Sequence, residues 1–442
     1  MRSAFSPRRH SLRPGARAAA LAFAAALALA PAHAQGPSPP PPDQAVAVDA
    51  RLVEKGGETL LEFDLSRAVE TRAFVLADPD RVVVELPEVA FRIEGDRRGA
   101  RGLVRAFRYG QFAQGRSRVV IDLARPARVV RAEAATFSRD GLGPARLTVA
   151  LAPESREAFR AAARRDAPMA REEAAALPSA QPSAHPSGKP VVVIDPGHGG
   201  VDSGAVSHAL AQETLEKTVV LDFARDLAKR LEGDGRFKVV MTRESDVFVS
   251  LEDRVRKARA AGAALFVSIH ADSLRNAQGV SGATVYTVSD RASDAEAARI
   301  AESENAADRA AGVESAESGG EVADILFDLT RRETRAFAGV FSRDLVARMS
   351  QATAMHRIPN RAAGFKVLKA PDVPSVLVEL GYLSSEKDVK AMTSPEWRAR
   401  STQAVGEAIR AFMAAAGAPT QASPAPAATR QAPPAPALAA RR

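Results

Sequence analysis

Three short segments, far apart in the sequence, each end a hydrophobic run with a side chain that can bind a metal ion or move a proton. They are VVVIDPGHGG, which contains His198, LFVSIH, which ends at His270, and PSVLVE, which ends at Glu379. Short apolar runs closed by turn residues are typical of buried strands in an α/β sheet. Because ligands lie outside the carboxyl ends of such strands, we expect two His and one Glu at one rim of one sheet. That arrangement is the one a zinc hydrolase requires, and it predicts an enzyme.

Any metal site in this chain must use His, Asp and Glu, because the chain has no cysteine. Disulfides and thiol nucleophiles are excluded for the same reason. Catalytic zinc takes three protein ligands and leaves one position for water. Only His198 and His270 end predicted strands, and the glycines beside His198 let the backbone crowd around an ion. The third ligand is expected at the start of the following helix, where Glu213 and Glu216 compete and His208 is an outsider.

The first 34 residues have the pattern of a secretory signal peptide. Arginines come first, an apolar run follows over residues 18–30, and Ala32-His33-Ala34 forms a small-residue cleavage site. The apolar run is too short to span a bilayer comfortably, so no stable membrane anchor is expected after cleavage. We therefore predict export to the periplasm. Because Arg8-Arg9 resembles a twin-arginine signal, export by that route is a further hypothesis.

The formal net charge of +8 does not predict a nucleic-acid-binding protein. Five of the positive charges are arginines in the predicted signal peptide, which holds no acidic residue. The mature chain therefore keeps only a small excess of positive charge and no electrostatic footprint for nucleic acid.

Residues 46–153 predict a small all-β sandwich domain, because several short strand patterns follow one another at regular spacing. The turn ADPD at 77–80 lies between two apolar runs and is a hairpin signal. The preceding residues 35–45 are Pro-rich and predicted to be disordered. Residues 154–189 are rich in Ala, Pro, Ser and charge, which indicates a linker with a short helix near 157–165.

Residues 190–416 alternate strand and helix patterns, which predicts an α/β domain with a mixed, mostly parallel sheet flanked by helices. A long helical insertion, from 293 to about 350, separates two of its strands. The remaining residues, 417–442, are rich in Pro and Ala and are expected to form a disordered tail.

Four motifs of this second domain, in this order, resemble the zinc-dependent N-acetylmuramoyl-L-alanine amidases that separate daughter cells. They are the DPGHGG turn, Glu216-Lys217 at a helix start, SIHAD around His270 and VELGYLS around Glu379. The resemblance implies that His198, Glu216 and His270 bind Zn²⁺ and that Glu379 is the catalytic carboxylate. It also implies that the chain hydrolyses the amide bond between N-acetylmuramic acid and L-alanine in peptidoglycan during cell division.

The sequence departs from this family at a few positions. The loop between His198 and Glu216 is slightly long, so Glu213 stays a competitor for the ligand role. Ser385 stands where the family usually has Asn, and Tyr382 replaces a common Phe, but neither position touches the metal chemistry.

Residues 81–87 and 104–123 resemble the AMIN domain, which precedes the amidase in this family. The resemblance implies a β domain that binds cell-wall material. A plain spacer or folding domain is the alternative.

The helical insertion predicts that the enzyme is held inactive by its own helix. Ser293 as N-cap and Glu296 form a capping-box signature, and the helix is expected to end near Gly312. Glu304 and Asp308 would lie one turn apart on one face, where an acidic side chain could occupy the open metal position. An ordinary solvated acidic face is the alternative.

The resemblance implies such an occluding helix, and a degenerate LytM-type activator as the partner that releases it. The candidate dock for this activator is an apolar stripe of Val322, Ile325, Leu326 and Leu329.

Two other functions would use the same residues. A zinc peptidase acting on cell-wall cross-links needs the same ion and the same base. A non-catalytic peptidoglycan-binding protein would be favoured if His198, His270 or Glu379 were replaced, and all three are present.

Overall fold

The computed structural model describes most of the chain between residues 44 and 417. The described ranges are 44–93, 99–113, 115–138, 143–175, 188–211, 213–274, 279–313 and 325–417. The predicted signal peptide, nearly all of the predicted stub and of the predicted tail, and Val322 of the predicted activator dock lie outside these residues. No side chain is described for Ile325, Leu326 or Leu329, so the dock stays a prediction.

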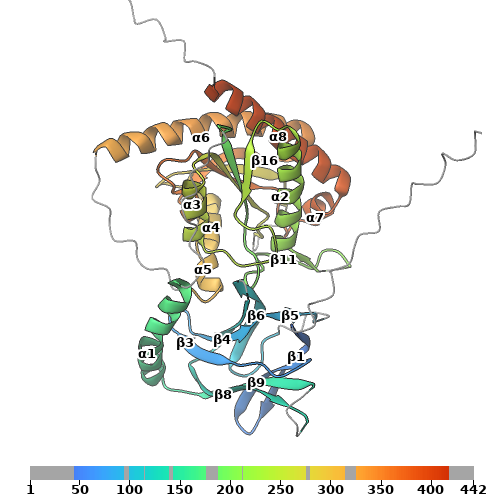
Figure 1. Cartoon of the computed structure of the whole chain (residues 1–442), viewed down its shortest axis with the longest axis vertical. Helices are drawn as coiled ribbons and strands as arrows, with labels where there is room; N and C mark the ends of the chain where they lie inside the picture. The colour runs from blue at the N-terminus through green and yellow to red at the C-terminus, as the bar shows by residue number, and fades with distance from the viewer. Residues whose placement is uncertain are drawn as a thin grey trace, which may run out of the picture. The chain divides into compact units, whose positions relative to one another are not determined.

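The first part of the chain folds as a β module of two packed sheets (Figure 1). One sheet has the strand order β5-β1-β2-β9-β8 and the other β3-β4-β7-β6. The bounds are β1 Ala45–Lys55, β2 Glu58–Leu65, β3 Arg72–Leu76, β4 Arg81–Pro87, β5 Val89–Phe91, β6 Val104–Ala113, β7 Arg116–Leu123, β8 Ala127–Thr136 and β9 Ala145–Pro153. The predicted all-β domain is confirmed.

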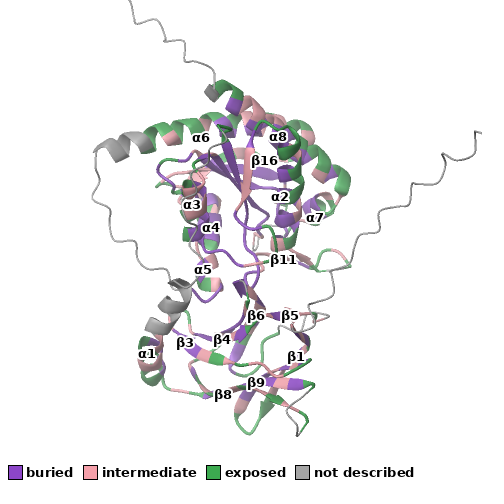
Figure 2. Ribbon diagram, viewed as in Figure 1, coloured by how far each residue is buried: buried purple, intermediate pink, exposed green. Residues whose placement is uncertain are grey.

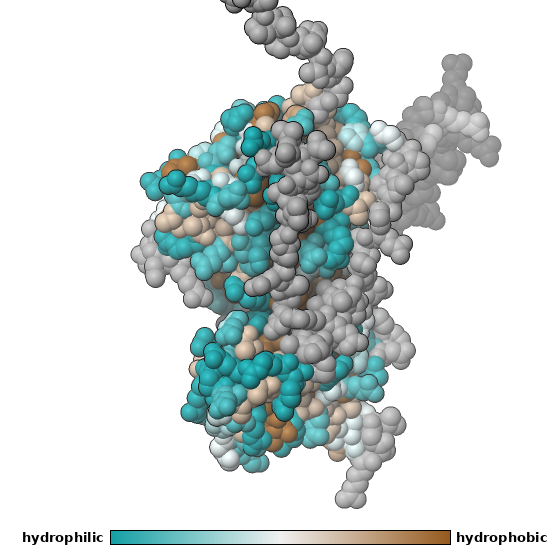
Figure 3. Space-filling view, turned by 90° about the vertical axis from the view of Figure 1, so that its left-hand side faces the viewer, coloured by the Kyte–Doolittle hydropathy of each residue, from teal (hydrophilic) through white to brown (hydrophobic). Residues whose placement is uncertain are grey.

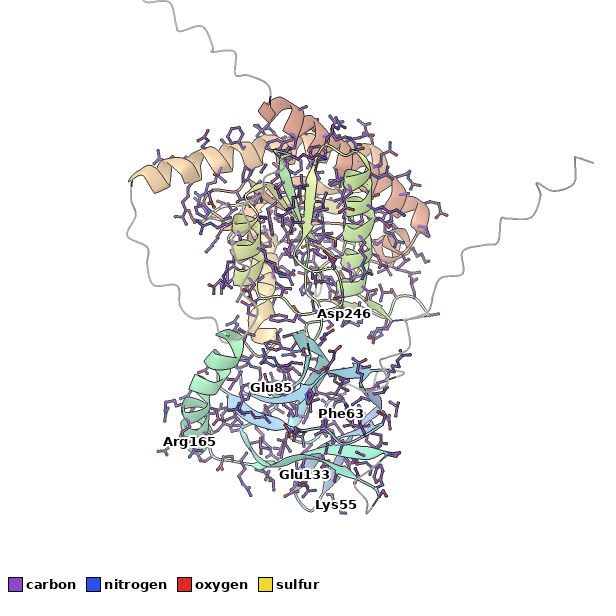
Figure 4. The ribbon with its side chains drawn as sticks, in the orientation of Figure 1. Lys55, Phe63, Glu85, Glu133, Arg165 and Asp246 are labelled. Carbon is purple, nitrogen blue, oxygen red and sulfur yellow. The ribbon has the colours of Figure 1, made fainter. Side chains whose placement is uncertain are left out.

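The core of the β module lies between its two sheets, because alternate residues of each strand point inward. Leu61 and Phe63 of β2 pack there with Val82 and Val84 of β4. Phe63, labelled in Figure 4, makes an edge contact with the ring of Phe107 at 6.0 Å between centroids.

Helix α1 (Arg156–Ala175) begins the segment that the sequence predicts as a linker, and it is longer than predicted. Phe159 and Ala163, four residues apart, join the core of the β module. The carboxylate of Asp166 accepts a hydrogen bond from the backbone N–H of Val75 at 3.0 Å. The first part of this segment is therefore packed against the β module.

The second part of the chain, from residue 191 to 417, is an α/β domain built on a six-stranded sheet of order β13-β10-β14-β17-β15-β16. Neighbouring strands run parallel except β15 and β17, which confirms a mixed, mostly parallel sheet. The bounds are β10 Val191–Pro196, β13 Lys238–Met241, β14 Ala263–His270, β15 Ala283–Val288, β16 Met355–Ala363 and β17 Ser375–Glu379, and a small ribbon pairs β11 Val206–Ser207 with β12 Thr214–Leu215.

Helices cover both faces of this sheet, so its central strands are almost entirely buried (Figure 2). Helices α2, α6, α7 and α8 pack on one face, and α3, α4 and the 3₁₀ turn η1 pack on the other. The bounds are α2 Glu216–Gly233, α3 Leu251–Ala260, α4 Ala295–Glu304, α5 Ala307–Ala310, α6 Ile325–Ala352, η1 Lys366–Leu368, α7 Glu386–Met392 and α8 Pro395–Gly417.

The N-terminal cap of α4 differs from the prediction. Asp294, not Ser293, is the N-cap, and its carboxylate accepts from the backbone N–H groups of Glu296 and Ala297. The Ser293 hydroxyl instead accepts from the N–H of Ala362 in β16 at 2.7 Å. Glu296 does not close a capping box, because its carboxylate pairs with Arg361 of the same strand at 2.5 Å. Both predicted capping residues therefore fasten the start of α4 to the edge of the sheet.

Residues from Gln44 onward belong to one compact unit. The face of the molecule seen in Figure 3 is mostly hydrophilic, with hydrophobic residues scattered over it. Within the described part of the chain, no helix is both long enough and apolar enough to cross a membrane.

Candidate metal centre

His198 lies in the glycine-rich turn that follows β10. Its φ of +57° is in the left-handed region, which costs a non-glycine residue about 1–3 kcal/mol unless its surroundings hold it there. The carboxylate of Asp202 lies 2.9 Å from Nδ1 of His198 and orients the ring so that Nε2 faces the site. Such a carboxylate–histidine pair is the usual support of a metal-binding imidazole.

Two buried arginines hold the backbone of this turn. Arg243 donates to the carbonyls of Pro196 and Gly197 at 2.9 and 2.7 Å. Arg254 donates to the carbonyls of Pro196 and His198, both at 2.7 Å, and forms an ion pair with the buried Asp195. Carbonyls of an irregular turn need such partners when they are buried. These arginines could not be identified from the sequence, since nothing in the pattern links Arg243 or helix α3 to the turn.

The turn is fastened to helix α2 as well. Asp246, labelled in Figure 4, accepts from the backbone N–H of Gly200 and from the ammonium group of Lys217, both at 2.7 Å. Gly197 allows a second close approach, because a Cβ there would lie 2.3 Å from Cε1 of His270. The turn and the His270 ring therefore fit together only with glycine at position 197.

Glu216 and His270 come from the start of α2 and the end of β14. The two carboxylate oxygens of Glu216 accept from the backbone N–H groups of Ala205 and Ala271, both at 2.8 Å. Glu216 is fully buried and His270 is 4% exposed. A buried carboxylate held by two backbone donors has a fixed orientation, which a metal ligand needs.

Four buried side chains meet at one point beyond the ends of β10 and β14. They are His198, Glu216, His270 and Glu304, each with one donor atom within 4.8 Å of the other three. Oε1 of Glu216 lies 3.2 Å from Nε2 of His198 and 3.2 Å from Nδ1 of His270. Oε2 of Glu304 lies 3.4 Å and 2.9 Å from the same two nitrogens.

This donor set fits a metal ion. Bond lengths of 2.0–2.1 Å to four tetrahedral ligands place the donors about 3.3 Å apart, close to the separations found here. Nε2 of His198 and Oε2 of Glu304 are buried and, among the described residues, have no hydrogen-bond partner. Buried polar atoms without partners are costly, and a divalent cation between these four atoms would satisfy both of them.

The charges of the cluster agree with a cation site. Burial lowers the pKa of His270, but the carboxylates of Glu304 and Glu216 outweigh burial and raise this pKa to about 10. Burial raises the pKa of Glu304, but the two imidazoles outweigh it and hold this pKa at about 2. Two ionised carboxylates in a buried site need positive charge between them.

Glu379 lies beside this cluster without belonging to it. It ends β17, directly opposite His270 in the strand register, and it is fully buried. Oε2 accepts from the backbone N–H of Asp272 at 3.0 Å, while Oε1 has no hydrogen-bond partner among the described residues. Burial raises the pKa of Glu379 well above its usual value. One oxygen is thus anchored, and the other is available to a proton.

The remaining candidates, and the other histidines that follow the predicted signal peptide, lie elsewhere. Glu213 and His208 are exposed, outside the donor cluster, and His356 is buried against Arg361. His185 lies outside the described residues. The structure therefore brings Glu216, and not its competitor Glu213, to the two histidines.

The helix that carries Glu304 is fastened at both ends. Its start is held through Asp294, Glu296 and Ser293, as described above. At its end, the amide of Asn305 donates to the carbonyl of Gly364 at 2.9 Å and accepts from the N–H of Lys366 at 2.7 Å. The carboxylate of Glu304 is thereby kept in the site.

Asp308 does not share the face of Glu304, contrary to the sequence prediction, because the helix breaks at Asn305 between α4 and α5. Its carboxylate instead accepts from the N–H of Leu251, at the start of α3, at 2.9 Å. Burial raises the pKa of Asp308 to about 6. The pKa of Asp308 in the folded state thus lies above its usual value of 3.8. The contribution of protonated Asp308 to the free energy of unfolding is therefore fully present below about pH 4 and is lost as the pH rises through 6.

We expect Asp308→Asn to be more stable than the native chain at pH 7, by about 1–3 kcal/mol in free energy of unfolding, because the amide keeps the acceptor without the buried charge. Near pH 4 the two proteins should be equally stable. Denaturant unfolding at both pH values measures this, with the exposed Asp290→Asn as control. An equal difference at both pH values would contradict the assignment.

The chain is similar in sequence to known proteins over both of its parts. The family model described as N-acetylmuramoyl-L-alanine amidase matches residues 192–411, and the AMIN domain model matches residues 48–151. The chain is 31% identical over 388 residues to the N-acetylmuramoyl-L-alanine amidase AmiC of Escherichia coli O6:H1, covering 84% of this chain and 90% of that protein. It is also 31% identical to the AmiC amidase of Neisseria meningitidis serogroup B, covering 82% and 89%. The solved structure of amidase AmiC2 of Nostoc punctiforme is 27% identical, covers 52% of this chain and 99% of that chain, and has a TM-score of 0.37.

Proposed function

We propose a zinc mechanism for this chain. The chain belongs to the N-acetylmuramoyl-L-alanine amidase family. It hydrolyses the amide bond between N-acetylmuramic acid and L-alanine in peptidoglycan. The reaction serves cell separation. The observation that supports the mechanism is the buried cluster of two imidazoles and two carboxylates at the strand ends. We infer that His198, Glu216 and His270 are the three protein ligands of the ion, since catalytic zinc takes His and carboxylate ligands and keeps one position open.

A bound zinc ion would polarise the scissile carbonyl and lower the pKa of the attacking water. Glu379 acts as general base and then as general acid: Oε1 takes the proton of the water and gives it to the leaving amine. The N–H of Asp272 fixes Oε2 and so orients Oε1. Burial of Glu379 favours this role, because a raised pKa brings the carboxyl closer to the working pH.

Glu304 is proposed to hold the enzyme inactive. Its carboxylate lies where the fourth, catalytic position of the ion would be, since it faces the same two nitrogens as Glu216. Water and substrate would then be kept away from a bound ion while α4 stays in position. We propose that a LytM-type activator docks on the helical arm around α6 and releases α4.

We expect Glu304→Ala to raise the basal amidase rate at least about tenfold without any activator, because it removes the carboxylate whose charge-assisted contacts with the two imidazoles keep the site closed. Dye release from labelled sacculi measures the rate. Glu302→Ala, at an exposed position of the same helix, is the matched control and should behave as the native chain. If Glu304→Ala retains its zinc and its rate is unchanged, Glu304 does not close the site.

The products of peptidoglycan digestion test the proposed function directly. Purified sacculi are incubated with the Glu304→Ala protein, with and without a zinc chelator, and the products are identified by mass. An amidase releases peptides that begin with L-alanine and leaves intact glycan strands, and chelation should stop this release. Shortened peptides still attached to muramic acid would instead identify a zinc peptidase.

The β module and the N-terminus have proposed roles that follow from the family. We propose that the AMIN domain binds cell-wall material and that the protein is exported to the periplasm, with the twin-arginine route as a hypothesis. Co-sedimentation of the inactive Glu379→Gln protein with intact sacculi tests the binding.

A further inference from the structure

Three arginines of the β module donate hydrogen bonds to consecutive backbone carbonyls just after the helix that carries Glu304. Arg81 comes from β4, Arg108 from β6 and Arg118 from β7, all in one sheet. The contacts are Arg81 to the carbonyl of Arg309, Arg108 to Ala310, and Arg118 to Ala311 at 3.0 Å and to Gly312 at 3.3 Å. The last carbonyls of a helix have no partner inside the helix, and here guanidinium groups supply the donors.

The arginines are held ready for this contact by their own module. Arg108 forms an ion pair with Asp122 at 2.6 Å. Arg118 forms an ion pair with Glu85, labelled in Figure 4, and its guanidinium lies 3.3 Å from the centroid of the Phe112 ring. Arg81 and Arg118 are each 1% exposed. Buried guanidinium groups must be paired. The carbonyls of residues 309–312 are therefore specific partners of the three arginines on this sheet of the β module.

An apolar cluster surrounds these hydrogen bonds. Phe112 and Val120 of the β module pack with Phe248, Ala311 and Val313 of the α/β domain. The rings of Phe112 and Phe248 are stacked, with 5.6 Å between centroids. Residues that follow α5 are therefore fixed between the two parts of the chain by apolar as well as polar contacts.

Strand β6 also touches the turn that carries His198. A Cβ on Gly110 would lie 2.4 Å from the carbonyl carbon and oxygen of Gly200, and a Cβ on Gly200 would lie 1.7 Å from the carbonyl oxygen of Gln111. The N–H of Phe248 donates to the carbonyl of Gln111 at 3.4 Å. The β module thus meets the metal-ligand turn on one side and the end of the occluding helix on the other.

We propose that the β module is a clamp that keeps the plug, defined as residues 295–313, in the metal site. The inference rests on the proposed function, because it takes Glu304 as the group that closes the site. Only nine residues of the plug, 305–313, follow Glu304, and five of those, 309–313, are held by the β module. Release of the clamp frees residues 309–313 and leaves Glu304 held through α4, Asn305 and the contact of Asp308 with Leu251.

Gly110→Ala tests the clamp, because its methyl group would push strand β6 away from the backbone of Gly200 and Val201. Gly110 is not at a positive φ, and the closest atoms that its new methyl group would meet all belong to Gly200 and Val201. The expected result is amide hydrogen exchange at least about fivefold faster in residues 295–313, together with a higher basal amidase rate. Exchange in the strands of the β module should stay unchanged.

Arg108→Gln is a second variant, because it removes one charge-assisted contact from the same face. It should also speed exchange in the plug, by about tenfold at most. Arg105→Gln is the matched control, since Arg105 lies on the same strand and is exposed. Its exchange should match that of the native chain.

Unchanged exchange of the plug in both Gly110→Ala and Arg108→Gln overturns the clamp. Faster exchange in both variants, with Arg105→Gln unchanged, supports it even if the chain has no amidase activity, because exchange does not depend on catalysis. A third outcome separates the clamp from the closure by Glu304. If exchange of the plug is faster in Gly110→Ala and Arg108→Gln but neither they nor Glu304→Ala show a higher basal amidase rate, the clamp is supported and the proposed closure by Glu304 is contradicted. If Gly110→Ala fails to fold, the comparison of Arg108→Gln with Arg105→Gln decides.

Discussion

Glu379→Gln is expected to lower kcat by about 100-fold or more while leaving the fold and the metal content unchanged. The magnitude is that of a lost general acid–base group. The amide matches the carboxylate in size and can still accept the hydrogen bond from Asp272, so the site keeps its shape. It cannot take up a proton from water. The comparison should be made in the Glu304→Ala background, which lacks the side chain proposed to close the site.

The measurements are single-turnover release of stem peptide and zinc content per chain. Glu386→Gln is the matched control, because this carboxyl is exposed and paired with Lys390 on the surface. A Glu379→Gln protein that keeps its zinc and works at a near-normal rate would move the base to another residue.

His270→Ala is expected to abolish metal retention. His270 supplies one of two nitrogens in the donor set, and it contacts both carboxylates. Its loss leaves Glu216 and Glu304 facing each other with one imidazole between them, so affinity for a divalent ion should fall by several orders of magnitude. Zinc per chain after dialysis, read by atomic emission, measures this. His208→Ala removes an exposed histidine and should retain one zinc.

The third ligand can be decided in the same assay. Glu216→Ala should lose the metal, and Glu213→Ala should keep it, since only Glu216 lies within the donor cluster. The opposite result would assign the ligand to Glu213 and require the loop before α2 to rearrange on metal binding.

The sequence predicted the two histidines and Glu379 as site residues because each follows a buried strand, and strand ends in an α/β sheet meet at one rim. The strand and helix pattern alone could not choose between Glu213 and Glu216, since both stand near the start of a helix; the family resemblance implied Glu216, with Glu213 as a competitor. The structure distinguishes them because Thr214-Leu215 pairs in a small ribbon, so that the helix begins at Glu216. Glu213 precedes that ribbon in the chain, and its side chain is exposed.

Other features could not be predicted because they depend on long-range contacts. The sequence treated residues 293–312 as one helix, whereas Asn305 bonds to Gly364 and Lys366 and the helix breaks there. Asp202 is only four residues from His198, and a carboxylate at that distance in a glycine-rich turn was a usable signal. Nothing in the pattern of β6 or β7 indicates that Arg108 and Arg118 meet residues 310–312, because periodicity reports burial but not the identity of the distant segment.

If Glu304 closes the site as proposed, metal binding and activation are opposing equilibria. In the closed state the ion would have a fourth protein ligand, and in the open state it would have three, so opening weakens its retention. Coupling of this kind is reciprocal, so removal of the ion must make the plug easier to open by the same factor. A cell short of zinc would therefore hold chains that bind the activator more tightly than loaded chains do, and that cannot cut the wall.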